Sequence, residues 1–303
     1  MGENAAVTFR SGFACFVGRP NAGKSTLINA LVGTKIAITS TRPQTTRHAV
    51  RGILHRPDAQ LVVVDTPGLH KPRTLLGERL NDVVRATWAE VDVVGLCVPA
   101  NEKVGPGDRY IARELSQMGR RTPIIGVVTK TDLVSKERVA EQLVALSALA
   151  QFADLVPVSA VSGFQVRVLA DLLVSTLPEG RPLYPEGELT DEPEETLVAE
   201  LIREAALEGV REELPHSIAV TVEEMAPRDG RTDLVDIHAT VYVERPSQKA
   251  IVLGSRGERM KQVGTVARHQ IEALLGSRVY LDLHVKVARD WQRDPRQLRR
   301  LGF

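Results

Sequence analysis

Cysteine is scarce in this chain of 303 residues, which contains only Cys15 and Cys97. Two cysteines are too few for the disulfide framework of a small secreted domain. Both lie in short apolar runs, so we expect them to be core residues in a reducing compartment. The seven histidines are scattered without a pair at the spacing of metal ligands, and the sequence therefore predicts no zinc site.

Long hydrophobic runs are also missing. No apolar segment approaches the roughly 20 residues that a membrane-spanning helix requires. Residues 1–12 lack the apolar core of a secretory signal peptide. The sequence therefore predicts a cytoplasmic protein.

Net charge is nearly absent from the chain as a whole, because 39 basic residues are balanced by 38 acidic ones. The parts of the chain differ. Residues 194–244 contain 4 basic and 13 acidic side chains, a net charge of −9, whereas residues 245–303 contain 13 basic and 5 acidic ones, a net charge of +8. The C-terminal segment thus carries a basic field that the total hides.

Length and composition predict two folded domains, since 303 residues exceed one typical domain and 43% of them are hydrophobic. Residues 13–177 alternate short apolar runs with helical stretches such as 108–118 and 136–149. This alternation predicts βαβ units and a doubly wound, mainly parallel sheet, an α/β fold. A Pro-Asp turn within residues 51–60 predicts one antiparallel hairpin. The predicted strands are 13–17, 49–54, 61–65, 93–98, 124–128 and 155–158.

Proline marks the end of this region. Residues 178–193 contain four prolines and two glycines, which cannot continue a helix or a central strand. We therefore expect a first domain at 1–178, a linker at 179–193 and a second domain at 194–303.

The second domain has a different pattern. A helix near 194–209 precedes strands near 217–225 and 233–244, helices near 247–253 and 258–275, and a strand at 279–287. The last two strands alternate apolar and polar residues, which indicates a sheet with one buried and one solvated face. The predicted order is α-β-β-α-α-β, an α+β domain.

The most specific motif lies between the first predicted strand and a helical segment. Residues 18–25 match G-x-x-x-x-G-K-[ST], the P-loop, which wraps backbone N–H groups around nucleotide phosphates. Lys24 is expected at the β- and γ-phosphates and Ser25 at Mg²⁺. The expected phosphate-binding residues are Gly18, Arg19, Pro20, Asn21, Ala22, Gly23, Lys24, Ser25 and Thr26.

A second motif, Asp-Thr-Pro-Gly, begins at Asp65 directly after a predicted strand. Asp65 can hold Mg²⁺ through water, and the Gly68 N–H can contact a γ-phosphate. Between the P-loop and Asp65, the polar segment 38–47 is a candidate switch loop in which Thr46 would complete the Mg²⁺ shell. The alternative for that segment is an ordinary solvated loop.

Two later strands end in residues suited to a guanine base. Thr129-Lys130-Thr131-Asp132 follows strand 124–128, and the Asp132 carboxylate can accept hydrogen bonds from guanine N1–H and the 2-amino group. The Lys130 stem can pack on the base. Ser159 and Ala160 follow strand 155–158, where a backbone N–H can meet guanine O6.

Together these motifs resemble the translation-factor-related GTPases, and specifically the bacterial Era family. Residues 18–25, 43–48, 65–70, 129–132 and 159–160 fall where that family has its five nucleotide motifs. The resemblance implies slow, Mg²⁺-dependent hydrolysis of GTP, with Lys24, Asn21, Thr46 and Gly68 as the residues that act on the phosphates.

Three positions refine this expectation. Thr129 stands where the family usually has an asparagine that tethers the base-binding loop to the P-loop, so we expect somewhat reduced guanine affinity. Leu69 replaces the water-orienting glutamine of many GTPases, which predicts slow turnover. Related GTPases with an asparagine at the position of Asn21 use K⁺ beside the phosphates, so K⁺ is an expected second cofactor.

In the second domain, residues 254–257 read Gly-Ser-Arg-Gly, a G-x-x-G loop between two predicted helices. Alone this motif is weak, and the alternative is a helix–turn–helix connection with a solvated basic face. The α-β-β-α-α-β order matches a type II KH fold, in which such a loop clamps four nucleotides of RNA. The expected RNA-binding residues are Lys249, Gly254, Ser255, Arg256, Gly257, Arg259, Lys261 and Arg268.

The Era family joins such a KH domain to its GTPase domain, and the resemblance covers approximately residues 8–303. It implies binding to the 3′ end of 16S ribosomal RNA, a role in assembly of the small (30S) ribosomal subunit, and a monomeric protein. A membrane-surface GTPase that regulates growth or division, with weak peripheral binding to the inner face of the cell membrane, is the alternative. A phosphate-transferring enzyme would need a second catalytic cluster, which the sequence does not contain.

Overall fold

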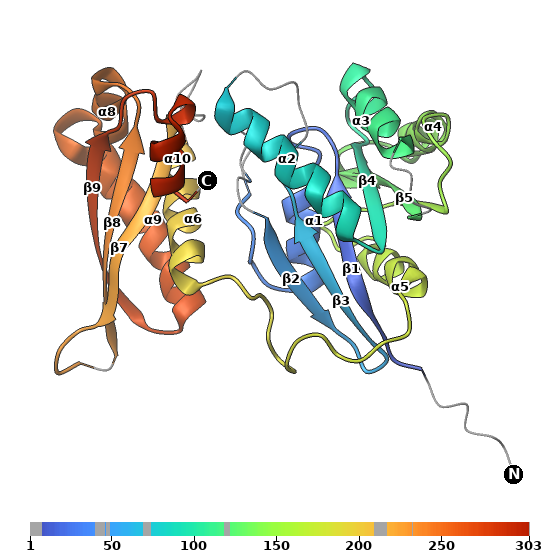
Figure 1. The fold of residues 1–303 in the computed structure, drawn as a ribbon, viewed down its shortest axis with the longest axis horizontal. Coiled ribbons are helices and arrows are strands. Elements are labelled where there is room, and N and C mark those ends of the chain that lie inside the picture. Colours follow the sequence, from blue (N-terminus) through green and yellow to red (C-terminus); the bar gives the residue numbers. More distant parts are fainter. Residues whose placement is uncertain are drawn as a thin grey trace, which may run out of the picture. The chain divides into compact units, whose positions relative to one another are not determined.

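The computed structural model describes residues 8–39, 46, 49–68, 74–117, 122–208, 217–231 and 233–302. The chain packs as two compact units (Figure 1). Unit 1 consists of Met1–Ala37, Thr46–Lys71 and Leu80–Asp191, and unit 2 of Ile38–Thr45, Pro72–Arg79 and Glu192–Phe303. Among the described helices, none is long and apolar enough to cross a bilayer.

Unit 1 is built on a six-stranded sheet of order β2-β3-β1-β4-β5-β6. All neighbouring strands are parallel except β2, which forms an antiparallel hairpin with β3. Both the mainly parallel sheet and the hairpin are thus confirmed. The strands are β1 (Arg10–Val17), β2 (Val50–His55), β3 (Ala59–Asp65), β4 (Val93–Pro99), β5 (Ile124–Thr129) and β6 (Asp154–Pro157).

Helices cover both faces of this sheet, as a doubly wound fold requires. One apolar core joins the sheet to α1 and α5, through residues such as Leu27 and Leu173. The other joins it to α2, α3 and α4, through residues such as Trp88, Ile111 and Leu146. The helices are α1 (Lys24–Val32), α2 (Leu75–Glu90), α3 (Pro106–Ser116), α4 (Lys136–Ser147) and α5 (Val166–Thr176).

The two cysteines are core residues, as predicted. Cys15 and Cys97 are fully buried free thiols. Burial raises the pKa of both, that of Cys97 to about 12, so both stay protonated at neutral pH.

The proline-rich segment after α5 is fastened to the sheet edge. The Ile53 N–H of edge strand β2 donates to the Leu189 carbonyl at 2.9 Å, and Arg51 pairs with Asp191 at 2.9 Å. The buried Gln60 side chain donates to the Tyr184 carbonyl at 2.9 Å. The Ile53–Leu189 bond pairs a backbone N–H of the edge strand, and the two side-chain contacts hold the segment beside it.

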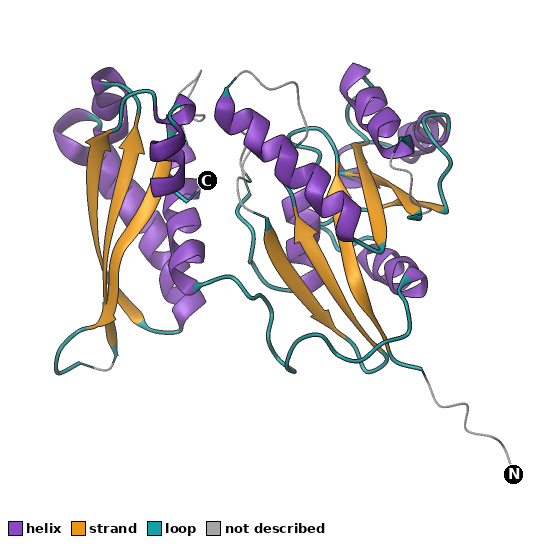
Figure 2. Ribbon diagram, viewed as in Figure 1, coloured by secondary structure: helices purple, strands orange, loops and turns teal. Residues whose placement is uncertain are grey.

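Unit 2 has a three-stranded sheet of order β7-β8-β9, with β7 antiparallel and β9 parallel to β8. Figure 2 distinguishes its helices from its strands. Side chains of α6, α8 and α9 form one core with the apolar face of the sheet, including Ile237 and Val241. The elements are α6 (Glu194–Leu207), β7 (Ala219–Pro227), β8 (Leu234–Val243), α8 (Pro246–Leu253), α9 (Glu258–Leu275) and β9 (Arg278–Val287), which confirms the predicted order.

A C-terminal segment completes this unit. The buried Trp291 donates its Nε1–H to the Ser217 carbonyl at 3.1 Å. Leu298, on the short helix α10 (Pro295–Arg300), is also fully buried. The segment is thus packed into the fold, while Arg296, Arg299 and Arg300 remain exposed.

Candidate nucleotide site and nucleic-acid interface

The P-loop connects the end of β1 to the start of α1, as predicted. A Cβ atom at Gly18 would lie 2.6 Å from the Cys97 carbonyl, so only glycine fits this close approach. Gly23 caps α1 with a φ of 87°, a left-handed conformation that favours glycine. The loop therefore lies at the N-terminus of a helix, whose free N–H groups and dipole favour bound phosphate.

Lys24 is the first residue of α1 and is buried, with 6% of its surface exposed. Its Nζ donates to the carbonyls of Gly18 and Arg19, at 3.3 Å in each case. Burial lowers the pKa of Lys24, and the nearby Asp65 carboxylate opposes this shift. A buried ammonium that donates to two carbonyls is suited to bind an incoming phosphate group.

The three predicted Mg²⁺ ligands lie together. Ser25 Oγ donates to Asp65 Oδ2 at 2.7 Å, and Thr46 Oγ1 lies 3.1 Å from the same oxygen and 3.0 Å from Ser25 Oγ. Neighbouring ligands of an octahedral Mg²⁺ are about 3 Å apart, since each lies about 2.1 Å from the metal. The 3.0 Å between the Ser25 and Thr46 hydroxyl oxygens therefore fits two direct ligands of Mg²⁺, and the Asp65 carboxylate lies beside both, where it can bind the ion through water.

The segment after β3 starts beside the P-loop. A Cβ atom at Gly68 would lie 3.0 Å from the backbone nitrogen of Pro20. This places Gly68 next to the phosphate-binding turn, where its predicted role requires it. Leu69, and residues 40–45 and 47 of the candidate switch loop, lie outside the described residues.

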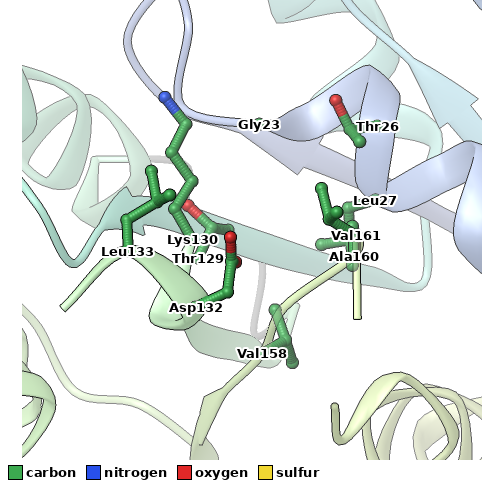
Figure 3. Close-up of a pocket in the computed structure, with 10 residues that line it drawn as sticks. All are labelled: Gly23, Thr26, Leu27, Thr129, Lys130, Asp132, Leu133, Val158, Ala160 and Val161. Atoms are coloured by element: carbon green, nitrogen blue, oxygen red, sulfur yellow. The ribbon is translucent and has the colours of Figure 1, made fainter. Parts of the chain in front are cut away.

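A pocket of about 200 Å³ lies where guanine binding was predicted (Figure 3). The Asp132 carboxylate points into the space between Lys130 and Ala160. Ser159 is fully buried, and its Oγ donates to Asp132 Oδ1 at 2.6 Å, which fixes the orientation of the carboxylate. The lining residues are Gly23, Thr26, Leu27, Thr129, Lys130, Asp132, Leu133, Val158, Ala160 and Val161.

Sequence reasoning missed the apolar part of this lining. Leu27, Leu133, Val158 and Val161 were not predicted as site residues, although each adjoins or follows a predicted motif. Val161 is 81% exposed and lines the pocket. Its exposure at the pocket rim was a signal that only the structure could provide.

Thr129 keeps the tether that its shorter side chain put in doubt. Its buried Oγ1 donates to the Ala22 carbonyl at 2.7 Å, which joins the base-binding loop to the P-loop. A hydroxyl thus makes the link that the family's asparagine side chain was expected to make. If Thr129 lowers the affinity for guanine, the loss must come from other contacts that the family's asparagine would make.

In unit 2, the G-x-x-G loop joins α8 to α9 as predicted. Gly254 and Gly257 have φ values of 72° and 79°, and Arg256 is held in the left-handed region at 52°. Ser255 and Arg256 are exposed at the tip of the loop, and Lys261 and Arg268 are exposed on α9. Lys249 is partly buried on α8.

Arg259 has a second role that its sequence position did not reveal. One guanidinium nitrogen, Nη2, donates to the carbonyls of Ala206 and Glu208, at 3.3 and 2.5 Å. These carbonyls lie at the C-terminal end of α6, where a positive charge is favourable. Arg259 therefore ties α9 to α6, in addition to its predicted contact with RNA.

Comparisons with known proteins match both domains. A profile of the family described as "50S ribosome-binding GTPase" matches residues 13–130, and a profile described as "KH domain" matches residues 213–292. GTPase Era of Streptomyces coelicolor is 69% identical to this chain, over 99% of this chain and 97% of that protein. GTPase Era of a Nocardioides species is 65% identical, over 100% and 99%.

Solved structures extend the comparison to the fold. A crystal structure of Era in complex with MgGDPNP and nucleotides 1506–1542 of 16S ribosomal RNA matches with a TM-score of 0.93 and 36% identity, over 97% of this chain and 99% of that chain. A point variant of Aquifex aeolicus Era bound to GDP.AlF4- gives the same TM-score, identity and coverage. The chain therefore belongs to the Era family of GTPases.

Proposed function

We propose that this GTPase binds the 3′ region of 16S ribosomal RNA through its KH domain and acts as a nucleotide-controlled switch in assembly of the 30S subunit. The observation that carries this proposal is the G-x-x-G loop at 254–257 with its exposed basic rim, in the same chain as a P-loop and a pocket beside Asp132. The full-length relative with 16S RNA supports the choice of RNA, because it covers both domains of this chain. The description "50S ribosome-binding GTPase" belongs to a family profile that matches residues 13–130 alone, so it does not cover the KH domain.

Guanine nucleotide binding uses three groups of residues. P-loop N–H groups and Lys24 hold the phosphates, and Asp132 accepts from guanine N1–H and the 2-amino group. Ser25, Thr46 and Asp65 would hold Mg²⁺, which neutralises charge on the β- and γ-phosphates when it is bound. The Gly68 N–H would donate to the γ-phosphate, so the loop that follows can respond to its loss.

Hydrolysis by this site is expected to be slow. Water must attack the γ-phosphorus in line with the leaving oxygen, and position 69 holds a leucine, which can neither orient water nor accept its proton. The remaining contributions are positioning and stabilisation of phosphate charge by Lys24 and backbone N–H groups. A slow intrinsic rate suits a switch whose timing is set by its partner.

K⁺ is proposed as a second cation beside the phosphates. Asn21 has a left-handed φ of 63° and is half-buried in the P-loop turn. Its amide oxygen is a hard ligand of the kind that alkali cations accept. We expect GTP turnover to be faster in KCl than in NaCl at matched ionic strength, and Asn21→Ala to remove the difference. Equal rates in the two salts would exclude a role for K⁺.

The RNA site is tested by charge reversal in the loop. Changing Ser255 and Arg256 to Asp places two negative charges where the phosphate backbone must pass. We expect about tenfold or greater loss of affinity for a 16S 3′-end RNA at low salt, and a smaller loss at high salt, since screening shortens the reach of the repulsion. Fluorescence anisotropy with labelled RNA measures both.

The chain offers a matched control at the other end of α9. Ser277 and Arg278 are the same pair of residue types, and 18 helical residues separate the two sites by about 27 Å. The double Asp variant there should bind RNA normally, and both variants should hydrolyse GTP at the parent rate without RNA. Undiminished RNA binding by the Ser255/Arg256 variant would show that this loop is not the clamp.

We further propose that the protein is a cytoplasmic monomer and that its partner is the 30S subunit. Sedimentation of the GTP-loaded protein with purified 30S and 50S subunits tests the partner, and light scattering tests the monomer. The membrane-surface alternative predicts stronger retention on anionic vesicles than on RNA beads at one salt concentration. Our proposal predicts the reverse.

A further inference from the structure

The side chain of Arg19, the second residue of the P-loop, is anchored in α3. Its Nε donates to Asp108 Oδ1 at 2.8 Å, and its Nη2 lies 3.1 Å from Glu102 Oε2. The Asp108 side chain is fully buried, whereas that of Arg19 is 25% exposed. This ion pair joins the phosphate-binding loop to a helix 89 residues later in the chain.

The acceptor in this pair is itself fixed. Asp108 lies in the first turn of α3, and its Oδ2 accepts from the Gly105 N–H at 2.8 Å. One carboxylate oxygen thus caps the helix and the other holds Arg19. Because the carboxylate is buried and bonded on both oxygens, it is a rigid support for the guanidinium.

The backbone of Arg19 serves the phosphate site directly. Its carbonyl accepts from the Ala22 N–H at 3.2 Å, which closes the P-loop turn, and from Lys24 Nζ at 3.3 Å. The residue whose side chain is anchored in α3 therefore also holds the phosphate-binding lysine. A shift of Arg19 would move both the turn and the ammonium.

Space for the Arg19 side chain depends on Gly107. A Cβ atom at that position would lie 2.8 Å from Arg19 Cδ and 3.1 Å from Cγ. Gly107 has no left-handed φ, so close approach of Arg19, and not backbone conformation, is what requires glycine there. The first turn of α3 is shaped to receive Arg19.

We propose that Asp108 is a positioning residue for nucleotide binding, which holds the P-loop in its phosphate-binding conformation through Arg19. A loop ordered in advance spares the nucleotide the cost of ordering it. Both GTP and GDP should benefit, because the P-loop turn contacts the β-phosphate that both carry. The chemical step should depend little on the pair, because Asp108 touches no reacting atom and bound phosphates themselves hold the P-loop and Lys24 in place.

Asp108→Asn separates this role from helix capping, because asparagine keeps an oxygen for the Gly105 N–H but loses the charge. We expect the Kd of GTP and of GDP to rise about tenfold, which corresponds to about 1.4 kcal/mol, with kcat within about twofold of the parent value. Arg19→Met should have the same effect. The double variant should be no worse than either single one, because both remove the same interaction.

Two further variants complete the experiment. Gly107→Ala should displace Arg19 and raise both Kd values while leaving the ion pair's residues in place. Arg56→Met is the matched control, since it removes a pair with Asp171 at the β2–β3 turn, at the opposite edge of the sheet. It should leave nucleotide affinity unchanged.

The Kd and kcat values of these variants decide between a positioning role and a merely structural one. Unchanged Kd values in folded Asp108→Asn protein, additive effects in the double variant, or a fall in kcat at unchanged Kd would each overturn it. Arg19→Lys should bind nucleotide more tightly than Arg19→Met, because lysine keeps a positive charge beside Asp108. If Asp108→Asn does not fold, the Gly107→Ala variant decides by the same measurements.

Discussion

Replacement of Lys24 by alanine is expected to abolish nucleotide binding at micromolar concentrations. Removing one partner of a buried, charged contact costs at least about 2 kcal/mol and often more, so we expect the Kd of GTP and GDP to rise roughly 30-fold or more. The reason is that Lys24 is 6% exposed and is held by carbonyls, ready for phosphate. Titration with a fluorescent GDP analogue measures the loss.

Lys136→Ala provides the control for this change, because it removes the same charge from the exposed start of α4. Its nucleotide affinity should match the parent. Circular dichroism must show that the Lys24→Ala protein is folded, since the substitution also removes a positive charge beside the buried Asp65. A folded Lys24→Ala protein with parental affinity would contradict the assignment of the P-loop.

The second large effect concerns the base. Asp132→Asn should lower affinity for GTP roughly 100-fold or more and favour xanthosine triphosphate, whose 2-oxo group requires a donor. The buried Ser159 Oγ can rotate to serve an amide in place of the carboxylate, so the pocket should survive the change. Competition of unlabelled nucleotides against a fluorescent analogue measures the preference.

Asp154→Asn is the control for the change of base preference, since this carboxylate is exposed at the start of edge strand β6. That variant should keep its preference for guanine. Equal affinity of the unaltered protein for ATP and GTP would disprove the guanine assignment, whatever the variants do.

Most of the nucleotide site could be predicted because its residues follow strands of a parallel sheet. The carboxyl ends of such strands meet at one edge, so Asp65, Asp132 and Ser159 could be placed together from their positions after apolar runs. The KH order could be predicted because alternation marks β8 and β9 clearly. The specific motifs then supplied the chemistry.

Contacts between distant segments could not be predicted. Nothing local in the sequence pairs Arg19 with Asp108, fastens the proline-rich segment to β2, or directs Arg259 to the end of α6. Helix α2 was not predicted by range, although its buried apolar residues Leu76, Leu80, Val84 and Trp88 recur every four residues. That helical period is visible in the sequence alone.

The measurement that tests the central claim most directly is crosslinking of the GTP-loaded protein to total cellular RNA, followed by sequencing of the captured fragments. Our account predicts strong enrichment of the 3′ end of 16S ribosomal RNA, and loss of that enrichment in the Ser255→Asp/Arg256→Asp variant but not in its Ser277→Asp/Arg278→Asp control. Enrichment of 23S fragments, or equal capture by both variants, would contradict it.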